Sequence, residues 1–384
     1  MSRHFDREGT VGIVRIGFTL GLGALLAVAL AAGASGKAGD IYIGNDGEGD
    51  TVVRIKPGSG AQKLIADGAP ITAPSGMGFA PNGKLYEADY ELPGIVQINP
   101  RTGATDDLAS GPPFFEEPLD VERGPDGFLY VAEESGTNRG ILRVNPRNGN
   151  TTSFVDDTGF IDSPFALTIR HRDGSIFVAD NDGEVVRVKR NGDQELVSDD
   201  PDLGTPQGIA LTPNGKLYVA EDLASTILRV NIRTGAAEVV ATDPLLEGVY
   251  NIDAEPRGTI VAAAQDTTNV PRVNVKTGAV STVSEGNLIT GPEGIAVEPP
   301  KCGGKLATIV GSTGRDRLVG SRFDDVIAGL GGGDTIDGGR GDDIVCGGPG
   351  GDELDGDSGR DRLDGQGGND DCSGGPGRDR ERSC

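Results

Sequence analysis

The sequence predicts an all-β protein, a six-bladed β-propeller followed by a parallel β-roll. Two periodicities carry this prediction. A unit of about 43 residues recurs through the first two thirds of the chain, as propeller blades do. A frame of about nine residues then runs without interruption through the remainder, as in a β-solenoid. A third observation, a basic and then apolar N-terminal stretch, sets the start of the chain apart from both domains.

Residues 1–34 have the composition of a secretory signal peptide. Three arginines precede an apolar stretch, and Ala32 and Ala34 form a small-residue cleavage motif. We therefore expect cleavage near Ala34 and a secreted, extracellular mature chain without a membrane anchor. A retained membrane helix is the alternative, but three glycines interrupt its apolar run.

Residues 40–299 contain the longer unit. Its two phrases, as in PQGIALTPNGKLYVAE and ILRVNIRTG, alternate apolar residues between N-G, D-G or T-G turns and so predict four short strands. The chain enters this region with the latter part of a unit and leaves it with the first part, near Pro292. Pairing the two parts would complete a sixth blade and close the ring. The glycines that end the second phrase are Gly60, Gly103, Gly149, Gly192, Gly235 and Gly278.

These units resemble NHL repeats and, more loosely, the gluconolactonase and virginiamycin lyase propellers. The resemblance implies a fold rather than a chemistry. A gluconolactonase-like, metal-dependent hydrolase would hold its metal with acidic and amide side chains of the central channel. The candidates on the innermost strands are Asp120, Glu122, Asn251, Asp253 and Glu293, whose simpler interpretation is the polar lining of a wet channel.

Other propeller residues point to structure. The acids that end the second strand of four blades recur in register and are expected to cap turns. His171 stands where other blades have proline, so we expect an exposed turn residue, and the histidine chemistry of the virginiamycin lyases is not expected. The recurring acids are Asp89, Glu133, Asp180 and Glu221.

Composition limits the partners of the chain. A formal net charge of −24 disfavours nucleic acid and anionic lipid surfaces. The lack of tryptophan argues against a strong platform for sugar stacking. For the propeller we therefore expect a non-catalytic binding module whose ligand is an extracellular protein or polymer.

Residues 300–384 contain the nine-residue frame. Each repeat begins with glycine, has aspartate at position six and, in most copies, an apolar residue at position eight. The glycines permit tight turns, and the short apolar strand predicts a stack in which alternate repeats lie on one another. The position-six aspartates are Asp316, Asp325, Asp334, Asp343, Asp352, Asp361, Asp370 and Asp379.

Rows of carboxylate and carbonyl oxygens suit a hard cation. The segment has no histidine, and its cysteines are not spaced as zinc ligands, so the pattern favours Ca²⁺. The repeats resemble the hemolysin-type (RTX) calcium-binding family, which implies that the eight aspartates are metal ligands. The alternative is a disordered Gly- and Asp-rich tail, and a segment that folds only with calcium lies between the two.

Four cysteines lie in this segment, which fits an oxidising compartment. Three pairings are possible. Cys346 is at an outward position and Cys372 at an inward one, so a bond between them has poor geometry. We favour Cys302 with Cys346 and Cys372 with Cys384, and free thiols are the alternative.

Overall fold

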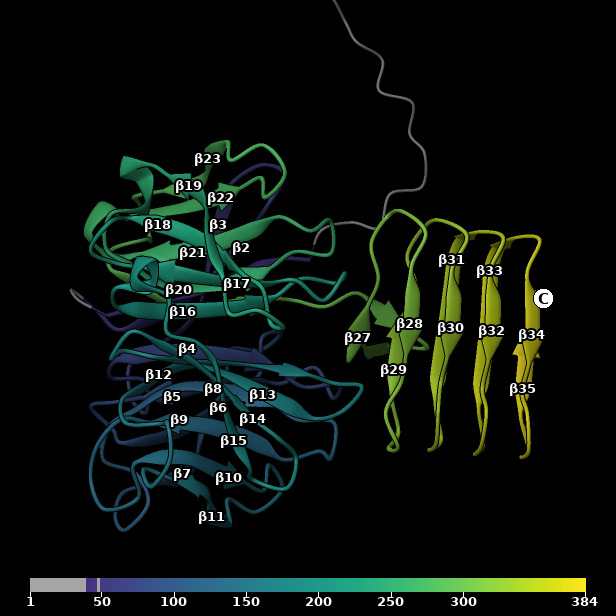
Figure 1. Ribbon diagram of the computed structural model, residues 1–384, viewed down its shortest axis with the longest axis horizontal. Helices are drawn as coiled ribbons and strands as arrows, with labels where there is room; N and C mark the ends of the chain where they lie inside the picture. The colour runs from purple at the N-terminus through teal and green to yellow at the C-terminus, as the bar shows by residue number, and fades with distance from the viewer. Residues whose placement is uncertain (1–38, 47–48) are drawn as a thin grey trace, which may run out of the picture. The chain divides into compact units, whose positions relative to one another are not determined.

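The computed structural model describes residues 39–46 and 49–384 (Figure 1). The expected signal peptide at residues 1–34 lies outside the described residues. Within the described ranges, no helix is long and apolar enough to span a membrane.

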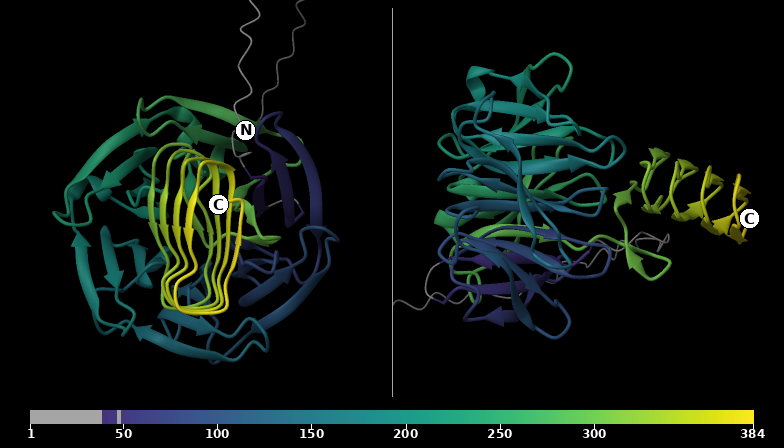
Figure 2. Two further views of the ribbon diagram at one scale, coloured as in Figure 1. Left: turned by 90° about the vertical axis from the view of Figure 1, so that its right-hand side faces the viewer. Right: turned by 90° about the horizontal axis from the view of Figure 1, so that it is seen from below.

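Six four-stranded antiparallel sheets form the blades of a propeller, as the sequence predicts. Blade 1 combines the two ends of the domain in the order β24-β1-β2-β3, and blades 2 to 6 follow in chain order. Figure 2 shows the sheets arranged around a central axis. Blade 1 contains β1 (Ile41–Asn45), β2 (Thr51–Lys56), β3 (Ala61–Asp67) and β24 (Pro292–Val297). Blade 2 contains β4 (Pro74–Phe79), β5 (Leu85–Asp89), β6 (Gly94–Ile98) and β7 (Thr105–Ser110). Blade 3 contains β8 (Pro118–Arg123), β9 (Leu129–Glu133), β10 (Gly140–Val144) and β11 (Thr151–Asp156).

The remaining blades repeat the same four strands, with three short 3-10 helices in their loops. Blade 4 contains β12 (Pro164–Arg170), β13 (Ser175–Asp180), β14 (Glu184–Val188) and β15 (Gln194–Ser198). Blade 5 contains β16 (Pro206–Leu211), β17 (Leu217–Glu221), β18 (Thr226–Val230) and β19 (Ala237–Thr242). Blade 6 contains β20 (Val249–Ala254), β21 (Ile260–Ala264), β22 (Asn269–Val273) and β23 (Val280–Glu285). The helices are η1 (Pro201–Leu203), η2 (Pro244–Leu246) and η3 (Gln265–Thr267).

Blade 1 closes the ring. Strand β1 pairs antiparallel with β24, and Ile43 lies opposite Ile295. Both side chains are buried in a cluster that also contains Val261 and Val270 of blade 6. The propeller core therefore lies between neighbouring blades, where apolar faces of adjacent sheets exclude water.

The C-terminal segment is a parallel β-roll in which strands eighteen residues apart pair in register, as the nine-residue frame predicts. Ile327 pairs with Val345, and Ile336 with Leu354. One sheet has the order β27-β29-β31-β33-β35 and the other β28-β30-β32-β34. The strands are β27 (Ile309–Val310), β28 (Arg317–Val319), β29 (Val326–Ala328), β30 (Thr335–Asp337), β31 (Ile344–Gly350), β32 (Glu353–Asp355), β33 (Arg362–Gly368), β34 (Asp371–Ser373) and β35 (Arg380–Arg382).

The core of the roll is a single row of position-eight side chains. Six of them are buried together, and Cys372 packs against them. A hairpin of β25 (Lys301–Cys302) and β26 (Lys305–Leu306) precedes the roll. The buried six are Leu318, Ile327, Ile336, Val345, Leu354 and Leu363.

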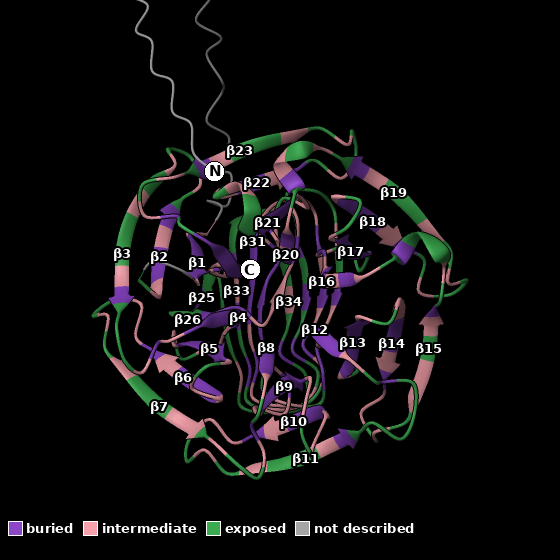
Figure 3. Ribbon diagram, turned by 90° about the vertical axis from the view of Figure 1, so that its left-hand side faces the viewer, coloured by how far each residue is buried: buried purple, intermediate pink, exposed green. Residues whose placement is uncertain are grey.

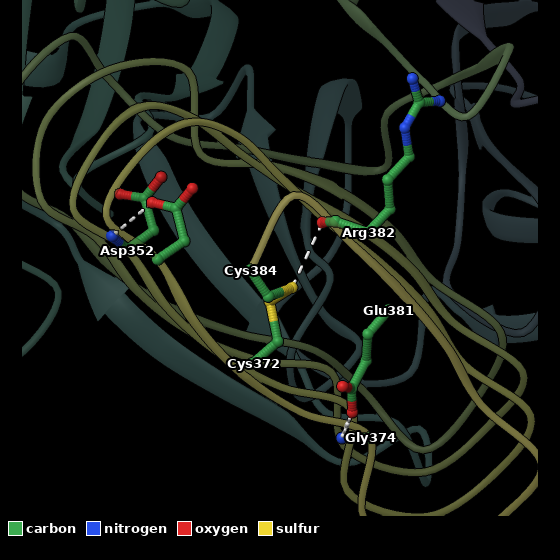
Figure 4. The surroundings of a disulfide bond; sticks show 7 residues. Asp352, Cys372, Gly374, Glu381, Arg382 and Cys384 are labelled. Atoms are coloured by element: carbon green, nitrogen blue, oxygen red, sulfur yellow. Dashed lines mark hydrogen bonds between the residues drawn. A yellow bond between two sulfur atoms is a disulfide. The ribbon is translucent and has the colours of Figure 1, made fainter.

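Both favoured disulfides are present. Cys302 bonds Cys346 and Cys372 bonds Cys384, and no described cysteine is free. The first ties the hairpin to β31, which explains why Cys346 is buried although it faces out of the roll. The second fastens the end of the chain to β34 (Figure 4).

Candidate metal centre and propeller channel

The position-six aspartates form two columns along the roll, because alternate repeats stack. In both columns, one carboxylate oxygen accepts the main-chain N–H of the aspartate eighteen residues earlier. The N···Oδ1 distances are 2.9 Å from Asp316 to Asp334 and 2.7 Å from Asp325 to Asp343. The first column contains Asp316, Asp334, Asp352 and Asp370, and the second Asp325, Asp343, Asp361 and Asp379.

The second carboxylate oxygen has a different environment. In five aspartates Oδ2 is buried without a hydrogen-bond partner among the described residues. Buried carboxylate oxygens normally have partners, because the loss of water otherwise costs free energy. The five residues are Asp334, Asp343, Asp352, Asp361 and Asp370.

Two aspartates at the start of the roll differ. Oδ2 of Asp316 accepts both the N–H and the hydroxyl of Ser312, at 2.6 and 2.8 Å. Oδ2 of Asp325 accepts the N–H of Ser321 at 2.6 Å. These serines occupy position two of their repeats, where the later repeats have none. The serine at that position was the sequence signal that separates the first two repeats from the others.

Burial and stacking disfavour negative charge in the middle of the columns. The pKa of Asp343 is raised to about 8, chiefly by burial and in addition by the neighbouring carboxylates of Asp325 and Asp361. Burial also raises the pKa of Asp334 to about 6, with Asp352 adding to the effect. A bound cation would favour the ionised forms of these groups.

Two of the candidate channel residues bridge the inner strands of neighbouring blades. Oδ2 of Asp120 on β8 accepts the N–H of Leu167 on β12 at 2.9 Å. Oδ2 of Asp253 on β20 accepts the N–H of Val297 on β24 at 2.7 Å. At the inner edges of blades 4 and 1, a carboxylate from the preceding blade thus provides the partner of a main-chain N–H.

A glycine on β4, the inner strand on the other side of β8, leaves room for the Asp120 carboxylate. A Cβ on Gly76 would lie 2.2 Å from Oδ1 of Asp120. Asp120 and Asp253 border a cavity at the centre of the ring, which agrees with their interpretation as polar lining of the channel, and their oxygens also accept backbone N–H groups.

The other candidates are Glu122, Asn251 and Glu293. The amide of Asn251 hydrogen-bonds to the carboxylate of Asp120, and Glu122 lies near Asp120 and Asp253. Glu293 lies apart from these four, beside Gln265 of blade 6. Among the described residues, no group of three or more His, Cys, Asp or Glu side chains is arranged to hold a metal ion.

The acids at the ends of the second strands cap turns, as expected. Asp89 accepts the N–H groups of Thr72 and Ala73, and Asp180 those of Asp162 and Ser163. Glu133 and Glu221 likewise accept main-chain N–H groups from loops of their own blades. The expectation for His171 was wrong in one respect. It lies in a turn, but it is half-buried, its Nδ1 has no partner in the described part of the chain, and burial lowers its pKa to about 4.

The model of the RTX calcium-binding nonapeptide repeat matches residues 310–345 and 347–381. This segment consists of RTX calcium-binding repeats. The name RTX roll is used below for residues 309–384, from β27 to the end of the sequence. No curated protein matches the chain.

The propeller is similar to chains in solved structures. A chain from the crystal structure of a nidogen/laminin complex has a TM-score of 0.58 at 13% identity, over 67% of this chain and 97% of that one. A virginiamycin B lyase from Staphylococcus aureus has a TM-score of 0.47 at 16% identity, over 58% of this chain and 73% of that one. The first likeness shows the fold alone.

The residues of the RTX roll fit calcium. The position-one glycines lie beside both the unpartnered Oδ2 atoms of the aspartates and main-chain carbonyl oxygens. A Cβ on Gly338 would lie 2.8 Å from Oδ2 of Asp343 and 3.0 Å from the carbonyl oxygen of Gly356. A side chain would thus fill a space bordered by two oxygens. Because no cluster of three acids exists in the described ranges, main-chain carbonyls would have to complete an oxygen shell, as they commonly do for Ca²⁺.

Proposed function

We propose that the RTX roll binds Ca²⁺ through its aspartate columns, and that the chain is a secreted protein whose propeller serves as a binding module. Five aspartates carry the calcium proposal, because each has a buried Oδ2 without a partner in the described residues. A divalent cation would supply that partner and offset the repulsion between stacked carboxylates. All eight position-six aspartates are proposed ligands, and Asp316 and Asp325 are the two whose Oδ2 already has a protein donor.

Secretion is supported by three observations. The N-terminus has the composition of a signal peptide, and both disulfides suit an oxidising compartment. Low-affinity calcium sites would also remain filled at extracellular calcium concentrations. The binding-module role rests on the propeller fold, whose loops form two faces.

Calcium titration of the full-length mature chain tests the metal site. Ions bound and heat released are measured by calorimetry, and β-structure is followed by circular dichroism. Asp343→Asn removes a buried, unpartnered ligand, whereas Asp342→Asn removes the same charge from the exposed neighbouring residue, which pairs with Arg360.

We expect Asp343→Asn to weaken calcium binding about tenfold or more, equivalent to about 1.4 kcal/mol. Asp342→Asn should stay within about twofold, and Mg²⁺ should not replace Ca²⁺, because it keeps its waters and requires a small octahedral shell. Equal losses in the two variants, or no calcium uptake by the wild type, would rule out the columns as the site.

A further inference from the structure

The two loop faces of the propeller carry opposite charge. In each antiparallel blade, the loops between strands two and three lie on the same face as the connections to the next blade. This face is called the acidic face below. In Figure 3 it is turned toward the reader. Its loops are 46–50, 90–93, 134–139, 181–183, 222–225 and 265–268, and its connections are 68–73, 111–117, 157–163, 199–205, 243–248 and 286–291.

The described part of these loops contains sixteen acidic residues and one basic residue, Arg139. The loops of the opposite face contain ten basic and four acidic residues. The propeller is therefore polarised along the ring axis, with negative charge on one face and positive charge on the other. The net charge of the whole chain does not show this separation. A field of this kind attracts oppositely charged partners and orients them.

Exposed apolar residues accompany the charge. Leu223 is 79% exposed and Phe160 is 44% exposed, and both are in loops of the acidic face. The exposure of large apolar side chains to water is unfavourable, and their burial by a partner would be favourable.

A buried carboxylate lies at the centre of this face. Glu293 is the second residue of β24, so it sits at the end of the inner strand nearest these loops. It is 3% exposed; Oε1 accepts a hydrogen bond from Gln265, and Oε2 has no partner among the described residues. Tyr90 and Tyr250 lie close enough for the Glu293 charge to raise the pKa of each phenol, although burial is the larger cause.

Aromatic rings beside an unpaired carboxylate are groups that recognise a guanidinium or ammonium. Tyr250 also packs edge-to-face on Phe165, with ring centroids 4.8 Å apart. Phe165, Tyr250 and Glu293 are each the second residue of an inner strand, so the three side chains lie at one level of the ring.

We propose that the acidic face docks a basic polypeptide segment, with one arginine or lysine side chain at Glu293 and apolar residues against Leu223 and Phe160. The proposal rests on the propeller being a binding module and names its face and the chemistry of its partner. A protein segment is favoured over a simple polyamine, because exposed apolar residues accompany the charge.

The test measures binding of a peptide of alternating arginine and leucine to the calcium-loaded full-length chain at low salt, by biolayer interferometry. The face variant is Glu91→Gln with Asp182→Asn and Asp266→Asn, three exposed residues of the acidic face without a side-chain hydrogen bond. The matched control removes the same charges from the RTX roll, by Glu353→Gln with Asp364→Asn and Asp371→Asn.

We expect the face variant to weaken binding about tenfold or more at low salt, where charge contributes most, and the roll control to change it less than about twofold. Glu293→Gln and Leu223→Ser should each weaken binding several-fold while the thermal melt of the propeller is kept. A peptide of alternating lysine and serine tests the apolar contribution and should bind more weakly.

Three results would overturn the proposal: no binding at low salt, equal losses in the face variant and the roll control, or binding of spermine as tight as that of the peptide. None of them depends on the calcium titration of the roll variants. If the calcium titration fails and the peptide binds as expected, the acidic-face proposal is supported and the calcium site is not. If the peptide does not bind and the calcium titration succeeds, the calcium site is supported and the acidic-face proposal is not.

Discussion

Aspartates that are identical in the sequence frame of the RTX roll have different environments in the structure. Oδ2 of Asp325 accepts the main-chain N–H of Ser321, whereas Oδ2 of Asp343, the next aspartate of the same column, has no partner among the described residues. The difference arises from position two of the repeat, which offers serine only in the first two copies.

The prediction at this scale compares Asp325→Asn with Asp343→Asn. Because Asp325 is already held by protein donors, its replacement should reduce calcium affinity less, by about threefold or below, against about tenfold or more for Asp343. Calorimetric titration of both full-length variants measures this. A larger loss at Asp325 would show that the first repeats bind the tighter ions.

Glu87 is a second residue whose environment differs from its counterparts. It is fully buried on β5, and neither carboxylate oxygen has a partner in the described part of the chain. The equivalent residues of blades 3 to 5 are Val131, Val178 and Val219. Burial raises the pKa of Glu87 well above its usual 4.5, and Asp89 raises it further.

We expect Glu87→Val to stabilise the propeller increasingly as pH rises. A raised folded-state pKa means that the contribution of the wild-type carboxyl is fully present below pH 4.5 and is lost as pH rises through the folded-state value. Near neutral pH the gain should be about 1–3 kcal/mol, the usual cost of a buried unpaired polar group.

The measurement is the difference in denaturant unfolding free energy between variant and wild type from pH 5 to 9. Glu87→Gln is the control, since it removes the titration but keeps a polar group. A difference that does not change with pH would contradict a buried, titrating Glu87.

At the scale of single elements, the Cys372–Cys384 disulfide fastens the last strands of the roll. It closes a loop with a sequence separation of 12, and the intervening β35 is exposed. We expect replacement of both cysteines by serine to destabilise the C-terminal turns by about 2–4 kcal/mol, because the unfolded segment gains freedom.

Hydrogen exchange measures this locally. Amides of β34 and β35 should lose protection in the double serine variant, while those of β29 and the propeller keep theirs. Uniform loss of protection across the whole roll would mean that the roll unfolds as one unit and that the disulfide is not a local fastener.

Much of this arrangement could be predicted from the sequence. The alternation of repeats gave the register of eighteen residues, and the spacing of the blade phrases gave six blades. The directions of Cys346 and Cys372 in their repeats argued against a bond between those two, and the pairing favoured from the sequence is the one observed. These features are local or periodic, so sequence distance is enough to define them.

The environment of Asp120 could not be predicted in this way. Its partner Leu167 is 47 residues away, and the room for the carboxylate depends on Gly76, which lies in the neighbouring blade on the other side. The burial of His171 and the isolation of Glu293 likewise depend on packing around the ring. The opposite charge of the two faces was recoverable, because strand direction alone assigns each loop to a face.

At the scale of the whole molecule, the ring depends on a pairing between the two ends of its domain. Deletion of residues 40–66 removes β1, β2 and most of β3, leaving β24 without its antiparallel partner and the buried clusters beside it open. We expect the entire propeller to lose its cooperative thermal transition, because apolar faces of two neighbouring blades become exposed. A truncated chain with the wild-type melting curve would show that five blades suffice.

The last turn of the RTX roll bears on whether rolls can associate end to end. A solenoid ends in a row of unpaired backbone groups, onto which another copy could add turns and so grow into a fibre. Here the final strand has Arg380, Glu381 and Arg382, all exposed, and Glu381 occupies the position that is apolar in the other repeats while accepting the N–H of Gly374. An incoming copy would have to bury that carboxylate against its own apolar row and displace the disulfide-fastened end of the chain. We therefore expect the roll to terminate itself, so that concentrated protein remains free of end-to-end filaments.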